Sequence, residues 1–132
     1  MNAKSLGNFP IHLGVGATAM VEPEFSGQMK WYEEYSTRHA DDGIEGRLVS
    51  MHTFEESWDS WEMHPNGCEV VICVSGSITL HQEEINGEIY TVILKSGQYA
   101  INEPGVWHTA DVYESTAAVF ITSGLGTQHR HR

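Results

Sequence analysis

The sequence has few of the features that define several large classes of protein. Seven lysines and arginines stand against eighteen aspartates and glutamates, which gives a formal net charge of −11 over 132 residues. This balance predicts that the chain binds neither nucleic acid nor an anionic membrane surface, because both require a basic face. No stretch approaches the ~18 consecutive apolar residues of a membrane-spanning helix.

Cysteine is also scarce, since Cys68 and Cys73 are the only two. If both lie on one extended strand, their odd separation points the side chains to opposite faces, so we expect no disulfide between them. Neither belongs to a Cys-x-x-Cys pair, so the sequence does not indicate a thiolate metal site. Two unpaired thiols are typical of a reducing compartment and predict a cytoplasmic protein.

The residues that are present predict one all-β domain. Hydrophobic residues make up 40% of the chain and aromatic residues 10%, which is ordinary for a globular protein with a single core. From residue 47 onward, apolar runs of about five to nine residues alternate with turn signals such as Asn86-Gly87. The predicted strands are 47–54, 60–64, 68–74, 78–85, 88–94, 98–102, 106–113 and 116–123. Strands of this number and spacing favour a β-sandwich or barrel.

The two ends of the chain are less regular than the middle. Residues 1–45 allow either a short helix near 25–32 or an irregular arm, and we expect this N-terminal arm to pack on the barrel or on a partner. Residues 46–122 form the predicted barrel. Residues 123–132 are polar, and we expect them to form a flexible tail.

One stretch, "SWEMHPNGCEV", concentrates groups able to bind a metal. On a strand, Glu62 and His64 project to the same side, and a tight turn brings Glu69 back beside them. A second stretch, "PGVWHTAD", supplies His108. These are either polar residues of a surface hairpin or ligands that converge on an ion. Buried carboxylates are costly unless they are paired or bound to a cation, and imidazole with carboxylate suits a first-row divalent metal.

The same residues resemble the two sequence motifs of the cupin superfamily. The matching pattern is Glu62-x-His64-x4-Glu69-x6-Gly76, followed by Gly97 and Pro104-Gly105-x-x-His108. The resemblance covers roughly residues 46–122 and implies a small jelly-roll barrel that holds a metal through His64, Glu69 and His108. The sequence departs from the family where Glu62 replaces the usual histidine, and six residues rather than five separate Gly97 from Pro104.

The resemblance implies one divalent transition metal (Mn, Fe, Ni or Zn) and a small-molecule ligand or substrate. Our first hypothesis is an enzyme that carries out metal-assisted oxygenation or isomerisation/lyase chemistry on a small oxygenated metabolite. The alternative is a non-catalytic cupin that binds a metal or senses a small ligand.

Three residues are candidates for a catalytic role. Glu62 is either a fourth ligand or a base held off the metal. His52 is predicted to face inward, where it is either a hydrogen-bonded core residue or a catalytic group. Tyr99 is either a proton donor near the site or a packing residue.

The sequence also predicts a homodimer. Residues 70–74 are apolar on both faces of the predicted strand, whereas an antiparallel sheet normally leaves one face in water. The aromatic N-terminal arm, from the same chain or from a second copy, is expected to cover the outer face.

Overall fold

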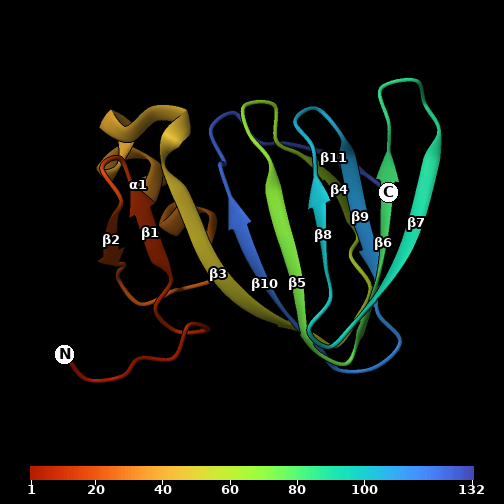
Figure 1. Ribbon diagram of the computed structural model, residues 1–132, viewed down its shortest axis with the longest axis horizontal. Coiled ribbons are helices and arrows are strands. Elements are labelled where there is room, and N and C mark those ends of the chain that lie inside the picture. The colour runs from red at the N-terminus through yellow and green to blue at the C-terminus, as the bar shows by residue number, and fades with distance from the viewer.

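A computed structural model describes all residues from Met1 to Arg132, and it consists mainly of two antiparallel β-sheets that face each other (Figure 1). The first sheet has the strand order β2-β1-β3-β10-β5-β8, and the second has the order β11-β4-β9-β6-β7. This arrangement confirms the predicted all-β, jelly-roll type of fold.

The strand bounds follow the predicted runs closely between residues 47 and 122. The first sheet contains β1 (Ile11–Gly14), β2 (Thr18–Val21), β3 (Arg47–Phe54), β5 (Glu69–Ser75), β8 (Tyr99–Asn102) and β10 (Thr116–Thr122). The second contains β4 (Ser60–Met63), β6 (Ser77–Glu83), β7 (Ile89–Lys95), β9 (Trp107–Asp111) and β11 (Gln128–His131). Gly76 makes the turn from β5 to β6 with φ 73°, and a Cβ there would lie 2.5 Å from the carbonyl oxygen of Ser115.

The space between the sheets is divided into an apolar part and a polar part. Strand alternation sends Glu69, Val71 and Cys73 of β5 to the inner face, so one strand contributes to both parts. The apolar core comprises Val71, Cys73, Ile78, Leu80, Leu94, Ala110, Val112, Ala118 and Phe120. Glu69, at the start of β5, therefore lies buried at the edge of this core.

The N-terminal arm is more regular than the sequence indicated. Its β1 and β2 form a hairpin, and β1 pairs with β3, so the arm extends the first sheet. Helix α1 (Met29–Arg38) and the 3₁₀ segment η1 (Ala40–Glu45) follow. Trp31 of α1 is buried, and Phe25 packs against His52 of the barrel with ring centroids 5.1 Å apart. The arm thus packs on its own barrel, and its four-residue strands are too short for their alternation to be recognised in the sequence.

The C-terminal segment differs from the expected flexible tail. Its residues Gln128–His131 form β11, which pairs with β4. The strand is held by Arg130, which donates to Glu83, and by Arg132, whose Nη2 lies 2.6 Å from Asp111 Oδ1. These partners lie far away in the sequence, so the polar composition of the segment alone did not indicate its docking.

No helix of the structure combines the length and apolarity needed to cross a membrane.

Candidate metal centre

Three of the four predicted ligands meet at the polar end of the barrel interior. Glu69 Oε2 lies 3.1 Å from His64 Nε2, and Glu69 Oε1 lies 3.2 Å from His108 Nε2. The relative exposures of His64, Glu69 and His108 are 5%, 3% and 0%, so water contributes little to their solvation. The interpretation of these residues as a surface hairpin is therefore wrong for Glu69 and the two histidines.

Hydrogen bonds fix the tautomer of both imidazoles. The hydroxyl of Thr127 donates to the carbonyl of Gly124, so it accepts a hydrogen bond from His64 Nδ1 at 2.8 Å. His108 Nδ1 donates to the carbonyl of Val106 at 3.3 Å. A neutral imidazole carries one N–H, so each ring presents an unprotonated Nε2 toward Glu69.

These two Nε2 atoms are buried and have no hydrogen-bond partner. Two nitrogen lone pairs that face a carboxylate within 3.2 Å repel its oxygens unless a proton or a cation lies between them. The His64 and His108 rings are tilted by 39° to each other, with centroids 5.2 Å apart. Two imidazole nitrogens and a carboxylate fit a first-row divalent ion.

The carboxylate of Glu69 is held from both sides. Asn102 Nδ2 donates to Oε1 at 3.1 Å, and Thr122 Oγ1 donates to Oε2 at 2.6 Å. Burial alone would raise the pKa of Glu69, but the adjacent imidazoles of His108 and His64, which donate from Nε2 to this carboxylate only when they are protonated, outweigh it and hold the pKa well below its ordinary value. Burial alone would lower the pKa of His64, but Glu69 outweighs it and raises that pKa. The site therefore favours positive charge beside Glu69.

Glu62, the residue that departs from the cupin pattern, lies at the open side of this group. Its side chain is 30% exposed, and its Oε2 lies 4.0 Å from His108 Nε2. Ligand atoms bound at 2.0–2.2 Å can lie up to about 4.4 Å apart, and one ligand atom each of Glu62, His64 and His108 lie within 4.8 Å of one another, so Glu62 is within reach of an ion bound by the two histidines. Its other oxygen, Oε1, accepts a hydrogen bond from His129 Nε2 at 2.9 Å. We call Glu62, His64, Glu69 and His108 the barrel cluster.

The other two candidate residues, His52 and Tyr99, lie on opposite faces of the first sheet. His52 faces inward, packs near Phe25 and Phe120, and has a pKa lowered by burial, although Glu62 acts in the opposite direction. Tyr99 is 65% exposed and lies opposite Ile72 on the outer face of the first sheet. Because Asn102 faces inward, strand alternation directs Tyr99 outward. The structure does not bring Tyr99 to the site.

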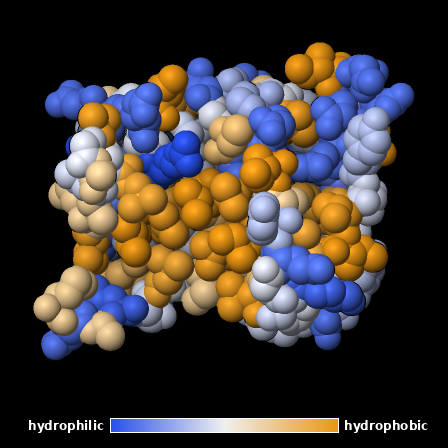
Figure 2. All heavy atoms as spheres, in the orientation of Figure 1, coloured by the Kyte–Doolittle hydropathy of each residue, from blue (hydrophilic) through white to orange (hydrophobic).

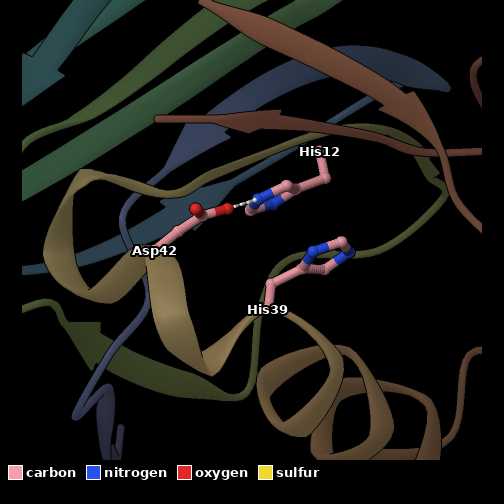
Figure 3. Close-up of side chains that lie close together, drawn as sticks. All are labelled: His12, His39 and Asp42. Atoms are coloured by element: carbon pink, nitrogen blue, oxygen red, sulfur yellow. Dashed lines mark hydrogen bonds and ion pairs between the residues drawn. The ribbon is translucent and has the colours of Figure 1, made fainter. Parts of the chain in front are cut away.

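A second group of histidines and a carboxylate, which the sequence analysis did not predict, lies in the N-terminal arm (Figure 3). Its members are His12, His39 and Asp42, and we call it the arm cluster. His12 Nδ1 and the hydroxyl of Tyr35 share a hydrogen bond of 2.6 Å. His12 Nε2 lies 2.6 Å from Asp42 Oδ2. His39 Nε2 donates to Glu22 at 2.8 Å.

The geometry of the arm cluster does not suit a metal ion. The rings of His12 and His39 are stacked, with centroids 3.6 Å apart and an interplanar angle of 11°. An imidazole lone pair lies in the ring plane, so one ion cannot lie in the planes of two parallel stacked rings. Both nitrogens of His12 already have partners. The arm cluster therefore fastens β1, α1 and η1 to one another.

Comparison with known proteins agrees with this fold. The profile of the family described as the cupin domain matches residues 47–124, which is more than half of the chain. No curated protein has a matching sequence.

Several solved structures share the fold at low sequence identity. A cupin-2 domain protein from Shewanella frigidimarina has 18% identity and a TM-score of 0.50, covering 58% of this chain and 69% of its own. A Klebsiella pneumoniae protein with a double-stranded β-helix domain has 22% identity and a TM-score of 0.53, covering 65% of this chain and 76% of its own. An oxalate oxidase has 12% identity and a TM-score of 0.52, covering 61% of this chain and 44% of its own.

The structural likenesses at these identities concern the fold alone. The match to the family profile spans β3 to β10 and includes all four residues of the barrel cluster. The chain therefore belongs to the cupin domain family.

Proposed function

We propose that this cupin is a metal-dependent enzyme that acts on a small oxygenated metabolite by oxygenation or by isomerisation/lyase chemistry. The observation that carries the proposal is the pair of buried, unpartnered Nε2 atoms of His64 and His108, which converge on Glu69. His64, Glu69 and His108 would hold one divalent ion, with Glu62 as the fourth ligand. Manganese, iron, nickel and zinc all accept this donor set.

A divalent ion bound there would supply Lewis-acid or redox chemistry to the reaction. The residues of the chain contribute the remaining steps. Glu62 is the one carboxylate of the barrel cluster that reaches solvent, so a substrate would approach the ion from the side of this ligand. His52 faces the same interior, and burial lowers its pKa and so favours the neutral form.

Aromatic side chains next to the barrel cluster favour a substrate with some apolar surface. Trp58 lies 6.4 Å from His108 between ring centroids, and it packs near Phe54 and Phe120. The indole Nε1 of Trp58 is buried without a hydrogen-bond partner. Because a buried unsatisfied donor is costly, an oxygen atom of the substrate would be a favourable acceptor for it.

The proposal is tested by metal analysis followed by a substrate screen. Purified protein should carry about one divalent ion per chain, as expected for a single site with these ligands. Oxygen consumption and product formation are then measured over a panel of small diketones, phenols and uronates. Turnover that disappears on chelation and returns with one added metal supports the enzyme. Protein that binds metal and small ligands without turnover supports the non-catalytic binding protein, and protein without metal contradicts both.

We also propose that the protein is a homodimer. The N-terminal arm packs on the inner side of the first sheet, through contacts such as Phe25 with His52, and it leaves the outer side of the sheet open. One row of directly paired, outward-facing residues crosses all six strands: Val21, Ile11, Val49, Ile121, Val70 and Ile101. Figure 2 shows apolar side chains gathered across this face.

A second copy of the chain is the occupant that best fits this face. With strands about 4.8 Å apart, this row over six strands and the next outward row over four of them (Met51, Val119, Ile72 and Tyr99) present roughly 300 Å² of projected area. This is within the range of a functional patch, whereas one partner of a small stable interface contributes about 600 Å², so the dimer would also bury residues around this face. The row carries no charge, so two copies with net charge −11 each meet where their repulsion is weakest.

Light scattering measures the mass of the protein in solution and so distinguishes a dimer from a monomer. The dimer predicts a mass of twice the 14.7 kDa of one chain at micromolar concentration. Ile72→Glu, on the outer face beside Val70, should give monomers. Ile93→Glu is the matched control, because Ile93 is an exposed isoleucine on β7 of the other sheet. A monomeric wild type would refute the dimer.

A further inference from the structure

The C-terminal segment, residues 127–131, contacts two residues of the barrel cluster. His129 of β11 lies directly opposite Glu62 of β4, and Glu62 lies directly opposite His108 of β9. The three side chains therefore form a row across neighbouring strands. Just before β11, the Thr127 hydroxyl accepts the Nδ1 hydrogen bond of His64.

The row divides the two oxygens of Glu62 between two neighbours. Oε1 accepts the hydrogen bond from His129 Nε2 at 2.9 Å, whereas Oε2 is directed to the barrel side, 4.0 Å from His108 Nε2. A carboxylate held by one oxygen presents the other in a fixed orientation. Without His129, a side chain that is 30% exposed is free to rotate into water.

Contacts outside the metal centre hold the strand in place. Arg132 Nη1 donates to the carbonyls of Trp58 and Ala110 at 3.0 and 3.2 Å. The guanidinium of Arg130 lies 4.6 Å from the ring centroid of Trp107. The position of His129 is therefore set by the fold and does not depend on its bond to Glu62.

We propose that His129 is a positioning residue of the metal centre, which fixes Glu62 as a ligand through one oxygen. The proposal rests on the metal site described under the proposed function. Residues that hydrogen-bond metal ligands typically change metal affinity by about 10- to 100-fold when they are removed.

The first test compares two histidines of the same strand. His129→Ala should weaken Mn²⁺ and Zn²⁺ binding by about 10-fold or more in competition with a chromophoric chelator. His131→Ala is the matched control, because His131 lies opposite Ser60 and forms no hydrogen bond with a ligand; its affinity should stay within about twofold of wild type. His129→Gln, which keeps a donor, should recover part of the loss.

A double-mutant cycle shows whether His129 acts through Glu62. In a Glu62→Ala background, His129→Ala should have no further effect on metal affinity. An undiminished effect in that background, or unchanged affinity of the His129→Ala protein, would overturn the proposal while leaving the metal site intact. A wild type that binds neither ion would overturn this proposal and the proposed function together.

Discussion

The barrel cluster and the arm cluster contain the same kinds of side chain but differ in where the imidazole nitrogens point. In the barrel cluster, both Nδ1 atoms are hydrogen-bonded and both Nε2 atoms are free, buried and directed toward Glu69. In the arm cluster, the rings of His12 and His39 are stacked, and His12 has partners on both nitrogens. Proximity alone is thus a poor criterion for a metal site, whereas convergent free lone pairs are a good one.

The largest expected difference between the clusters is in bound metal. His64→Ala and His108→Ala should each reduce the metal content from about one ion per chain to nearly none, since each removes a nitrogen ligand from a four-residue site. His12→Ala should leave the content unchanged. Elemental analysis of the dialysed proteins measures this, and loss of metal from the His12 variant alone would reverse the assignment of the two clusters.

For the stability of the fold, we expect substitution in the arm cluster to have a large effect, although it leaves the metal content unchanged. His12 is 1% exposed, and His12→Ala removes the buried partner of the Tyr35 hydroxyl and leaves a cavity. We expect the free energy of unfolding to fall by about 1–3 kcal/mol, measured by chemical denaturation with metal chelated. His131→Ala on the exposed C-terminal strand should change it by less than about 0.5 kcal/mol. A His12 variant as stable as wild type would contradict the fastening role of the arm cluster.

The pH dependence of metal binding should distinguish the barrel cluster further. Glu69 raises the pKa of His64 above its ordinary value of 6.5, so His64 is protonated up to a higher pH in the metal-free protein than a free histidine would be. A protonated imidazole cannot bind a metal, and affinity should therefore fall as the pH is lowered through this raised pKa.

Calorimetry in buffers of different ionisation enthalpy measures the protons released on binding. Near pH 6.5 we expect metal binding to release protons, and the number of protons released should decrease as the pH rises. The proton release should be smaller in His64→Ala, although its metal binding is weak and needs high ion concentrations. A metal affinity that is constant from pH 6 to pH 8, without proton release, would show that protonation of His64 does not compete with metal binding.

The smallest expected effect concerns anionic ligands. With Glu62 and Glu69 both bound, a divalent ion has no formal net charge, whereas three histidines and one carboxylate leave a charge of +1. We therefore expect a neutral or singly charged substrate, and oxalate and malonate should bind Glu62→His more tightly than wild type. Equal affinity of both proteins for these dianions would show that the charge of the site does not select the substrate.

The strands and ligands that depend on local pattern were predictable from the sequence. The strand 47–54 matches β3 residue for residue, because its alternation is long enough to recognise. The spacing of Glu62, His64 and Glu69 around one turn placed three potential ligands on the same interior, and the structure shows Glu69 and His64 in contact.

The parts that depend on distant partners were not predictable. β11 is polar throughout, and its docking rests on Asp111, Glu83 and β4, which no local pattern connects with it. The local sequence therefore predicts that His129 lies in a free tail. Tyr99 lies outside because the register of β8 places Asn102 inward, and a four-residue strand shows too little alternation for this to be read in advance.

We propose that the free Nε2 atoms of His64 and His108 define one metal site, which they share with Glu69 and Glu62. The most direct measurement is an anomalous difference map of a crystal soaked with Mn²⁺ or Zn²⁺ and recorded at the absorption edge of that metal. We predict one peak, about 2.0–2.2 Å from both Nε2 atoms, and none beside His12 and His39. A peak in the arm cluster, or no peak in the barrel cluster, would show that the free Nε2 atoms do not mark the metal site.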